Sequence, residues 1–150
     1  MNNPFIHLRS LSSYSLSEST LKITNLVDLA KKNDMPAIAI TDNNNMFGVF
    51  EFSKECVKNN IQPIIGTSIN LLDIIVNNQI SQVTFLVKNE IGYRNLLELS
   101  SLSHLNEGNN VGIYFSQLEK FSEGLFCYIG GEFNPLLLLN NCLLYTSPEP

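Results

Sequence analysis

Short apolar runs that alternate with amphipathic segments are the feature of this 150-residue sequence that most restricts its fold. Residues 37–40 (Ala-Ile-Ala-Ile) and 62–66 (Gln-Pro-Ile-Ile-Gly) have the length of strands, and such continuous apolar runs are typical of buried parallel strands. Around them, residues 21–33, 46–58 and 90–102 carry apolar side chains at helical spacing. Strands that alternate with helices in this way predict an α/β protein with a mainly parallel sheet.

Weaker patterns complete this prediction. We expect further strands over residues 5–8, 69–76, 83–87 and 125–129, with a turn at residues 77–79. Ser19 or Thr20 is the expected cap of the first helix, and Ser116 to Glu119 fits a capping box at a short helix. The predicted inner face of the helix over residues 90–102 consists of Tyr93, Leu96, Leu97 and Ser100.

Three segments follow the carboxyl ends of predicted strands, which is where the working residues of α/β folds lie. They are residues 7–11, 41–45 and 66–68. The fold class alone therefore predicts the functional site at these segments.

Charge and cysteine content exclude several classes of protein. With 14 acidic and 9 basic side chains the formal charge is −5, which argues against this piece alone gripping a nucleic-acid backbone. Cys56, Cys127 and Cys142 are too far apart for a zinc pair and odd in number, so we expect buried, reduced thiols in the cytoplasm. The longest apolar stretches have about five residues, far fewer than the roughly 20 that span a bilayer.

Isolated histidines and aromatic residues have ordinary structural explanations. His7 is expected to be a strand-end histidine with a hydrogen-bonded ring, and His104 a solvated residue at a helix end. Among Phe47, Phe50 and Phe52, helical spacing places at least one in the core, and no basic stripe accompanies them for single-strand binding. Cys127, within a predicted strand, is expected to fill the core.

Six segments, taken together, carry a specific resemblance. Their order and spacing from about residue 4 to 134 resemble the N-terminal PHP (polymerase and histidinol phosphatase) domain of bacterial DNA polymerase III alpha subunits. The segments are Pro4–Leu8, Ser13–Leu16, Asp34–Asp42 with Asn45–Gly48, Ile61–Gly66, Lys88–Leu97 and Ser122–Leu125.

This resemblance implies a PHP-type distorted βα barrel, of which the chain holds only the N-terminal portion. Residues 1–141 are then a partial PHP domain, and residues 142–150 a non-native or truncation tail, with a native linker as the alternative. An incomplete barrel leaves open strand edges, so we expect the chain to be poorly soluble in isolation.

The resemblance also implies where metal ligands would stand. In metal-containing members a His-x-His motif falls at Arg9 and Leu11, and a carboxylate at Glu18. The Thr-Asp-His motif is Thr41-Asp42-Asn43 here, and Ser68 stands where a glutamate is expected. A later histidine and a later cysteine align less securely with Gln82 and Gly131.

These replacements predict a degenerate site that holds no metal and has no catalytic residue. Leucine cannot bind a metal, and arginine brings a fixed positive charge to a cation's place. Asp42 and Glu18 remain open to two readings, a paired-carboxylate site or a salt bridge with Arg9, and we favour the salt bridge because unpaired buried carboxylates are unfavourable.

The functional expectation is the N-terminal fragment of a replicative DNA polymerase III alpha subunit, a cytoplasmic nucleotidyltransferase that uses magnesium in regions absent from this chain. This segment is expected to need no cofactor and to be a scaffold that docks the proofreading exonuclease subunit and other polymerase III subunits. Contact with DNA would belong to the absent regions, and no contact with a membrane is expected. Two alternatives are a metal-dependent PHP phosphoesterase or 3'-5' exonuclease, and a truncated gene product with no selected role.

Overall fold

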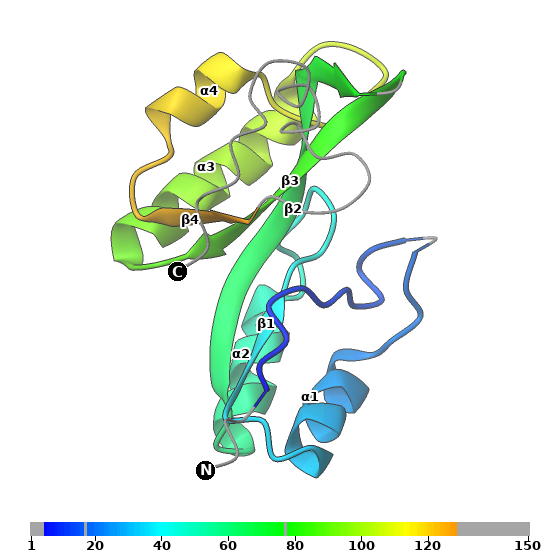
Figure 1. Cartoon of the computed structure of the whole chain (residues 1–150), viewed down its shortest axis with the longest axis vertical. Helices are drawn as coiled ribbons and strands as arrows, with labels where there is room; N and C mark the ends of the chain where they lie inside the picture. The colour runs from blue at the N-terminus through cyan, green and yellow to red at the C-terminus, as the bar shows by residue number, and fades with distance from the viewer. Residues whose placement is uncertain (1–4, 17, 77, 129–150) are drawn as a thin grey trace, which may run out of the picture.

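The computed structural model describes residues 5–16, 18–76 and 78–128, which form a mixed α/β structure (Figure 1). Its elements in chain order are α1 (Ile23–Lys32), β1 (Ala37–Ile40), α2 (Val49–Lys58), β2 (Gln62–Val76), β3 (Gln79–Val87), α3 (Glu90–Leu105), α4 (Phe115–Lys120) and β4 (Leu125–Tyr128). The predicted helices and β1 are confirmed in type, and their boundaries differ by up to three residues.

The four described strands form one sheet in the order β1-β2-β3-β4. Only β1 and β2 run parallel, and both other pairs are antiparallel, so the prediction of a mainly parallel sheet is wrong. Asn78, with a φ of +62°, lies in the short connection between β2 and β3. A connection this short permits only an antiparallel pair, because a parallel pair needs a long crossover.

Strand β2 is a single element that runs the length of the molecule (Figure 1). The sequence predicted two strands, over residues 62–66 and 69–76, because the polar pair Thr67-Ser68 interrupts the apolar pattern. Both residues instead continue the pairing, Thr67 opposite Phe85 and Ser68 opposite Thr84. Their hydroxyl groups are hydrogen-bonded, so the polar side chains are accommodated inside the sheet.

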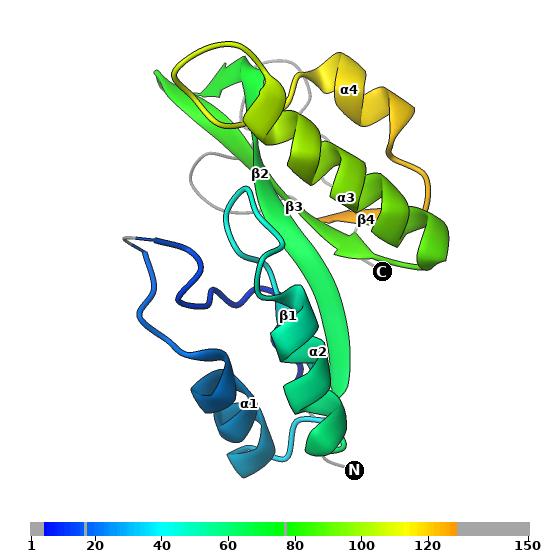
Figure 2. The same ribbon diagram turned by 180° about the vertical axis from the view of Figure 1, so that it is seen from behind.

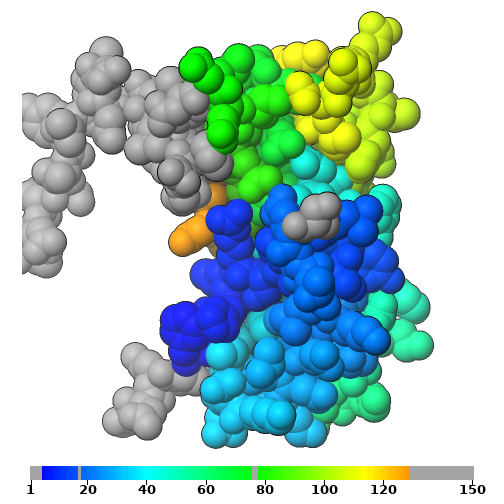
Figure 3. Space-filling model, turned by 90° about the vertical axis from the view of Figure 1, so that its right-hand side faces the viewer, coloured from blue at the N-terminus to red at the C-terminus, as the bar shows by residue number. Residues whose placement is uncertain are grey.

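The N-terminal segment, residues 5–12, lies along the edge of β1 that faces away from β2. It is extended but is not a strand, contrary to the prediction for residues 5–8. The Ala39 N–H donates to the His7 carbonyl at 2.9 Å, and the Thr41 N–H donates to the Ser10 carbonyl at 2.8 Å. In Figure 3 this segment (blue) lies between the light blue region of α1 and the green strands.

Two apolar clusters hold the helices against the sheet. The first lies between α1, α2 and β1 and includes Val27, Ile38 and Phe52, all at most 2% exposed. The second lies under α3 and includes Ile69, Phe85, Leu96 and Leu99. Seen from behind, in Figure 2, α3 and α4 cover the upper part of the sheet and α2 the lower part.

The buried face of α3 differs in part from the predicted one. Leu96 and Ser100 are buried as expected, whereas Tyr93 and Leu97 are 36% and 41% exposed. Gly92 is also buried, and a Cβ atom there would collide with the carbonyl of Gly124. This close approach, which only glycine permits, holds the first turn of α3 against the residue before β4.

Helix caps were predicted less well than the helices themselves. Lys22 occupies the N-cap of α1, so neither Ser19 nor Thr20 caps it. The Ser19 hydroxyl instead accepts the Leu21 N–H at 3.2 Å and donates to the Leu11 carbonyl at 3.0 Å.

Helix α4 begins one residue before the predicted capping box. Phe115 is its first residue, and the Gln117 side-chain oxygen accepts the Tyr114 N–H at 2.9 Å. The reciprocal side chain is therefore Gln117 and not Glu119.

The two described cysteines lie in different environments. Cys56 is fully buried on the inner face of α2, as expected. Cys127 is exposed on β4, so the prediction that Cys127 fills the core is wrong. Cys142 lies outside the described residues.

The difference in exposure between Cys56 and Cys127 predicts unequal reactivity of their thiols. Burial and the neighbouring Glu55 carboxylate raise the pKa of Cys56 to about 11, and burial also raises the pKa of Cys127. At pH 8, about one Cys56 in a thousand is therefore a thiolate. Iodoacetamide should label Cys127 well before Cys56 in the native protein and both in denaturant, as measured by peptide mass spectrometry; equal native rates would contradict the described packing.

Candidate functional site

The loop after β1 brings the three predicted segments together. Asn44 has a φ of +52°, a conformation that asparagine tolerates better than most residues, and its N–H donates to the Ser68 carbonyl at 2.7 Å. Asn43 forms an isolated bridge with Ser68, and Thr41 bonds the N-terminal segment at Ser10. The three segments therefore lie together, although residues 66–68 lie within β2 and not in a loop.

Asp42 is the buried carboxylate of this site, with 2% of its surface exposed. Its Oδ1 atom accepts the Ser12 N–H at 2.7 Å and the Ser15 hydroxyl at 2.6 Å, and its Oδ2 atom accepts the Ser12 hydroxyl at 2.6 Å. Hydrogen bonds to a charged acceptor are stronger than those between neutral groups. Asp42 thus ties residues 12–15 to the end of β1.

A second set of polar side chains forms a chain of hydrogen bonds beside Asp42. The Arg9 guanidinium donates to Gln82 Oε1 at 3.3 Å, and Gln82 Nε2 donates to Asn43 Oδ1 at 3.3 Å. Asn43 Nδ2 in turn donates to the Glu18 carboxylate, and Gln82 Nε2 also lies 3.3 Å from Asn70 Oδ1. Arg9, Gln82, Asn43 and Glu18 are four of the aligned metal-ligand positions, so the fold brings these positions into direct contact.

The predicted salt bridge of Arg9 with Asp42 or Glu18 is wrong. Within residues 5–16, 18–76 and 78–128, Arg9 makes no ion pair with either carboxylate. Asp42 is enclosed by serine donors, and Glu18 is bonded by the Asn43 amide, so each carboxylate already has a neutral partner.

The other aligned positions carry no charge. Ser68 is fully buried, and its hydroxyl lies 2.8 Å from Thr84 Oγ1 and 3.4 Å from the Thr41 carbonyl. Leu11 is half-buried beside a groove. Gly131 lies outside the described residues.

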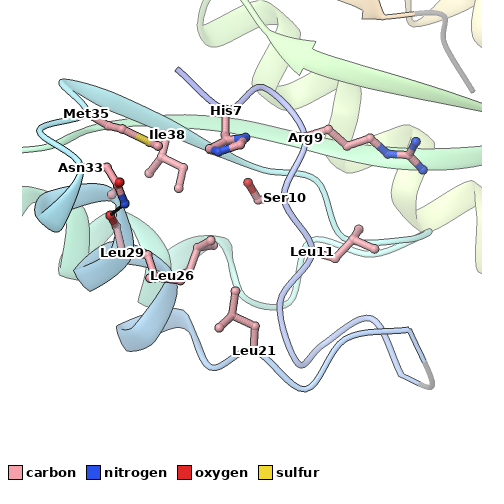
Figure 4. A pocket seen from close by; sticks show the side chains of 11 residues that line it. His7, Arg9, Ser10, Leu11, Leu21, Leu26, Leu29, Asn33, Met35 and Ile38 are labelled. Carbon is pink, nitrogen blue, oxygen red and sulfur yellow. Dashed lines mark hydrogen bonds between the residues drawn. The ribbon is translucent and has the colours of Figure 1, made fainter. Parts of the chain in front are cut away.

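The groove, of about 320 Å³, lies between the N-terminal segment and α1 (Figure 4). Leu26, Leu29 and Met35 lie on one side of this segment, and Arg9 and Leu11 extend on the other. The lining is mainly apolar and includes no carboxylate. The groove can therefore take apolar groups, and His7 is the one imidazole among the described residues of its lining.

The side chains gathered at this site do not fit a divalent metal centre. Such a centre needs several carboxylate or imidazole ligands, and within the described part of the chain no three His, Cys, Asp or Glu side chains group together. Both oxygens of the buried carboxylate, Asp42, already accept protein donors. Arg9 and Leu11 contribute no lone pair at all.

The two histidines lie apart from each other. The His7 ring stands edge-on to Phe5, with 4.6 Å between ring centroids. His104, in the last turn of α3, places Nε2 2.7 Å from the Asn44 carbonyl and stacks on Phe47. It is therefore more than the solvated residue that the sequence suggested, because it joins α3 to the loop after β1.

Tyr14, in the serine-rich stretch of residues 10–19, links that stretch to α2. Its hydroxyl donates to the Glu51 carboxylate at 3.3 Å, and the negative charge of Glu51 raises the pKa of Tyr14 above its ordinary value. The ring packs against Gly48, where a Cβ atom would lie 2.8 Å from it.

Ser12 and Ser15 were not identified from the sequence. They stand in a serine-rich stretch, residues 10–19, that was assigned only as a loop. The available signal was chemical: a buried Asp42 needs hydrogen-bond donors, and this stretch offers several hydroxyl groups.

Comparison with known proteins defines the class of the chain. The PHP domain family matches residues 7–144, so the chain belongs to the PHP domain family. It is homologous to the N-terminal region of DNA polymerase III subunit alpha. It is 41% identical to that subunit of Rickettsia felis over 157 aligned positions, which cover 99% of this chain, and 39% identical to that of Borreliella burgdorferi. The chain spans only 12% and 13% of the lengths of these two relatives.

A solved structure supports the fold alone. A protein of Bifidobacterium adolescentis, described as a metal-dependent phosphoesterase, superimposes with a TM-score of 0.50 at 17% identity. The match covers 67% of this chain and 32% of that protein. Among the described helices, none is long and apolar enough to cross a membrane.

Proposed function

We propose that this chain is the N-terminal PHP region of a replicative DNA polymerase III alpha subunit and that it acts as a metal-free scaffold in cytoplasmic DNA replication. The homology to alpha subunits along nearly the whole chain supports the first part. Nucleotidyl transfer, its magnesium ions and contact with DNA would then belong to other regions of the polypeptide. No residue of this chain takes part in that reaction.

The observation that carries the scaffold role is the hydrogen bonding at the aligned ligand positions. Gln82 accepts a hydrogen bond from Arg9 and donates one to Asn43, and the Asp42 carboxylate accepts hydrogen bonds from Ser12 and Ser15. These bonds join the N-terminal segment, the loop after β1 and β3. In a metal-containing member, metal ions would hold these segments together through their ligands. Here we propose that hydrogen bonds hold the same segments together.

A metal-dependent phosphoesterase or 3'-5' exonuclease is the second candidate. The fold likeness to a protein described as a metal-dependent phosphoesterase is the observation in its favour. Such chemistry needs a metal-bound water activated for attack on phosphorus. The donor set at this site argues against this activity, because the buried carboxylate of Asp42 already accepts three hydrogen bonds from protein donors. A truncated product with no selected role is the third candidate.

The proposed partners are the proofreading exonuclease subunit and other polymerase III subunits. The test is co-purification of the full-length gene product with the exonuclease subunit of the same organism. We expect a stoichiometric complex that is lost when residues 1–128 are deleted while primer extension persists. A folded, polymerase-active product that forms no complex would contradict the docking role.

A further inference from the structure

Helix α2 has apolar residues on two opposite faces. Val49, Phe52 and Cys56 face the core and are at most 7% exposed. Phe50 and Val57, on the other face, are 76% and 67% exposed. A helix at the surface of a soluble protein usually has one apolar stripe and a polar opposite face, so the second stripe calls for an explanation. In Figure 2, no other described element crosses in front of α2.

The exposed stripe forms a shallow groove with basic side chains. Phe50, Ser53, Lys54, Val57 and Lys58 line a space of about 430 Å³, at the helical spacing i, i+3, i+4, i+7 and i+8. The ammonium group of Lys54 lies 5.5 Å from the centroid of the Phe50 ring. Two lysines beside two exposed apolar side chains would attract a segment that carries both apolar groups and carboxylates.

The carboxylates of α2 offset this positive charge at Lys58 but not at Lys54. Glu51 accepts the Tyr14 hydroxyl, and Glu55 interacts with the Asn59 amide and with Lys58 at 3.3 Å. Lys54 has no such carboxylate partner in the described part of the chain. In a chain with a formal charge of −5, this groove therefore combines exposed apolar side chains with one lysine, Lys54, that has no ion-pair partner in the described residues.

We propose that the outer face of α2 docks an acidic amphipathic helix of the partner protein, with its apolar side chains against Phe50 and Val57 and its carboxylates at Lys54 and Lys58. This inference rests on the docking role proposed above and names the surface that performs it. The length of the stripe, seven residues from Phe50 to Val57, is about 10 Å, which matches two turns of a partner helix.

The test measures the affinity of the full-length gene product for the purified exonuclease subunit by calorimetry. Val57→Glu and Lys54→Glu should each weaken binding by about tenfold or more, because they place a carboxylate against an acidic, apolar ligand. Leu105→Glu is the matched control, since Leu105 is also an exposed apolar residue, at 76% compared with 67% for Val57, but lies at the end of α3. It should change the affinity less than twofold. Thermal melting of each variant verifies that it remains folded.

Salt provides an independent readout. Raising the ionic strength should weaken binding of the unchanged protein and have less effect on Lys54→Glu, because an exposed charge pair is screened by salt.

The outcomes separate this surface from the docking role itself. If the unchanged protein binds but Val57→Glu and Lys54→Glu bind equally well, the α2 surface is overturned while the docking role stands. If the unchanged protein does not bind at all, both fail. If Lys54 resists amine labelling equally with and without the partner, a later region of the same polypeptide covers α2, and the inference is again overturned.

Discussion

Replacement of Asp42 by alanine is expected to lower the free energy of unfolding by about 3–5 kcal/mol, the range reached when a buried hydrogen-bond network is broken. The substitution leaves the Ser12 N–H and the hydroxyls of Ser12 and Ser15 without their acceptor in a buried site. A hydroxyl group can rotate toward another partner, but the backbone N–H cannot. The attachment of residues 12–15 to the end of β1 should therefore be lost, while the backbone bonds of His7 and Ser10 remain.

Two control variants make this prediction specific. Asp42→Asn keeps the shape and one acceptor oxygen, so we expect an intermediate loss. Glu18→Ala removes an exposed carboxylate and should change the stability by less than about 0.5 kcal/mol. Urea denaturation followed by circular dichroism measures all three variants. An Asp42→Ala protein as stable as Glu18→Ala would show that the serine contacts contribute nothing.

The second large effect is expected at Phe52, which is fully buried between α1, α2 and β1. Phe52→Ala should lower the free energy of unfolding by about 3–5 kcal/mol, since it removes buried apolar surface and leaves a cavity. Phe50→Ala is the matched control on the opposite face of the same helix, and it should lower the stability by less than about 1 kcal/mol, because Phe50 is 76% exposed. The same denaturation experiment compares them, and similar losses for the two variants would contradict the described orientation of α2.

Local patterns were sufficient to predict the helices and β1. Leu26, Val27 and Ala30 lie on one side of α1 because their spacing matches the turn of the helix. The antiparallel direction of β3 follows from the short turn expected over residues 77–79, because a parallel pair needs a long crossover. The continuity of β2 was not predictable in this way, because it depends on hydrogen bonds that bury Thr67 and Ser68 and do not change the apolar pattern.

The position of the candidate site was predictable, and its hydrogen bonds were not. Residues 7–11 lie beside residues 41–45, where the Thr41 N–H donates to the Ser10 carbonyl, although no described strand precedes residues 7–11. Which side chain pairs with which depends on tertiary geometry. Asp42 accepts hydrogen bonds from Ser12 and Ser15 and not from Arg9, whose guanidinium extends to Gln82 on β3.

The boundary at residue 141, the nature of residues 142–150 and the low solubility of the isolated chain remain predictions. The described residues end at Tyr128, before the boundary and the tail.

Titration of this chain with Zn²⁺ in a calorimeter, with and without Asp42→Ala, tests the central claim most directly. If hydrogen bonds have replaced the metal, neither protein should bind Zn²⁺ stoichiometrically, because Asp42 is occupied by Ser12 and Ser15 and its aligned neighbours are Arg9 and Leu11. Stoichiometric, micromolar or tighter binding that Asp42→Ala abolishes would contradict the metal-free account.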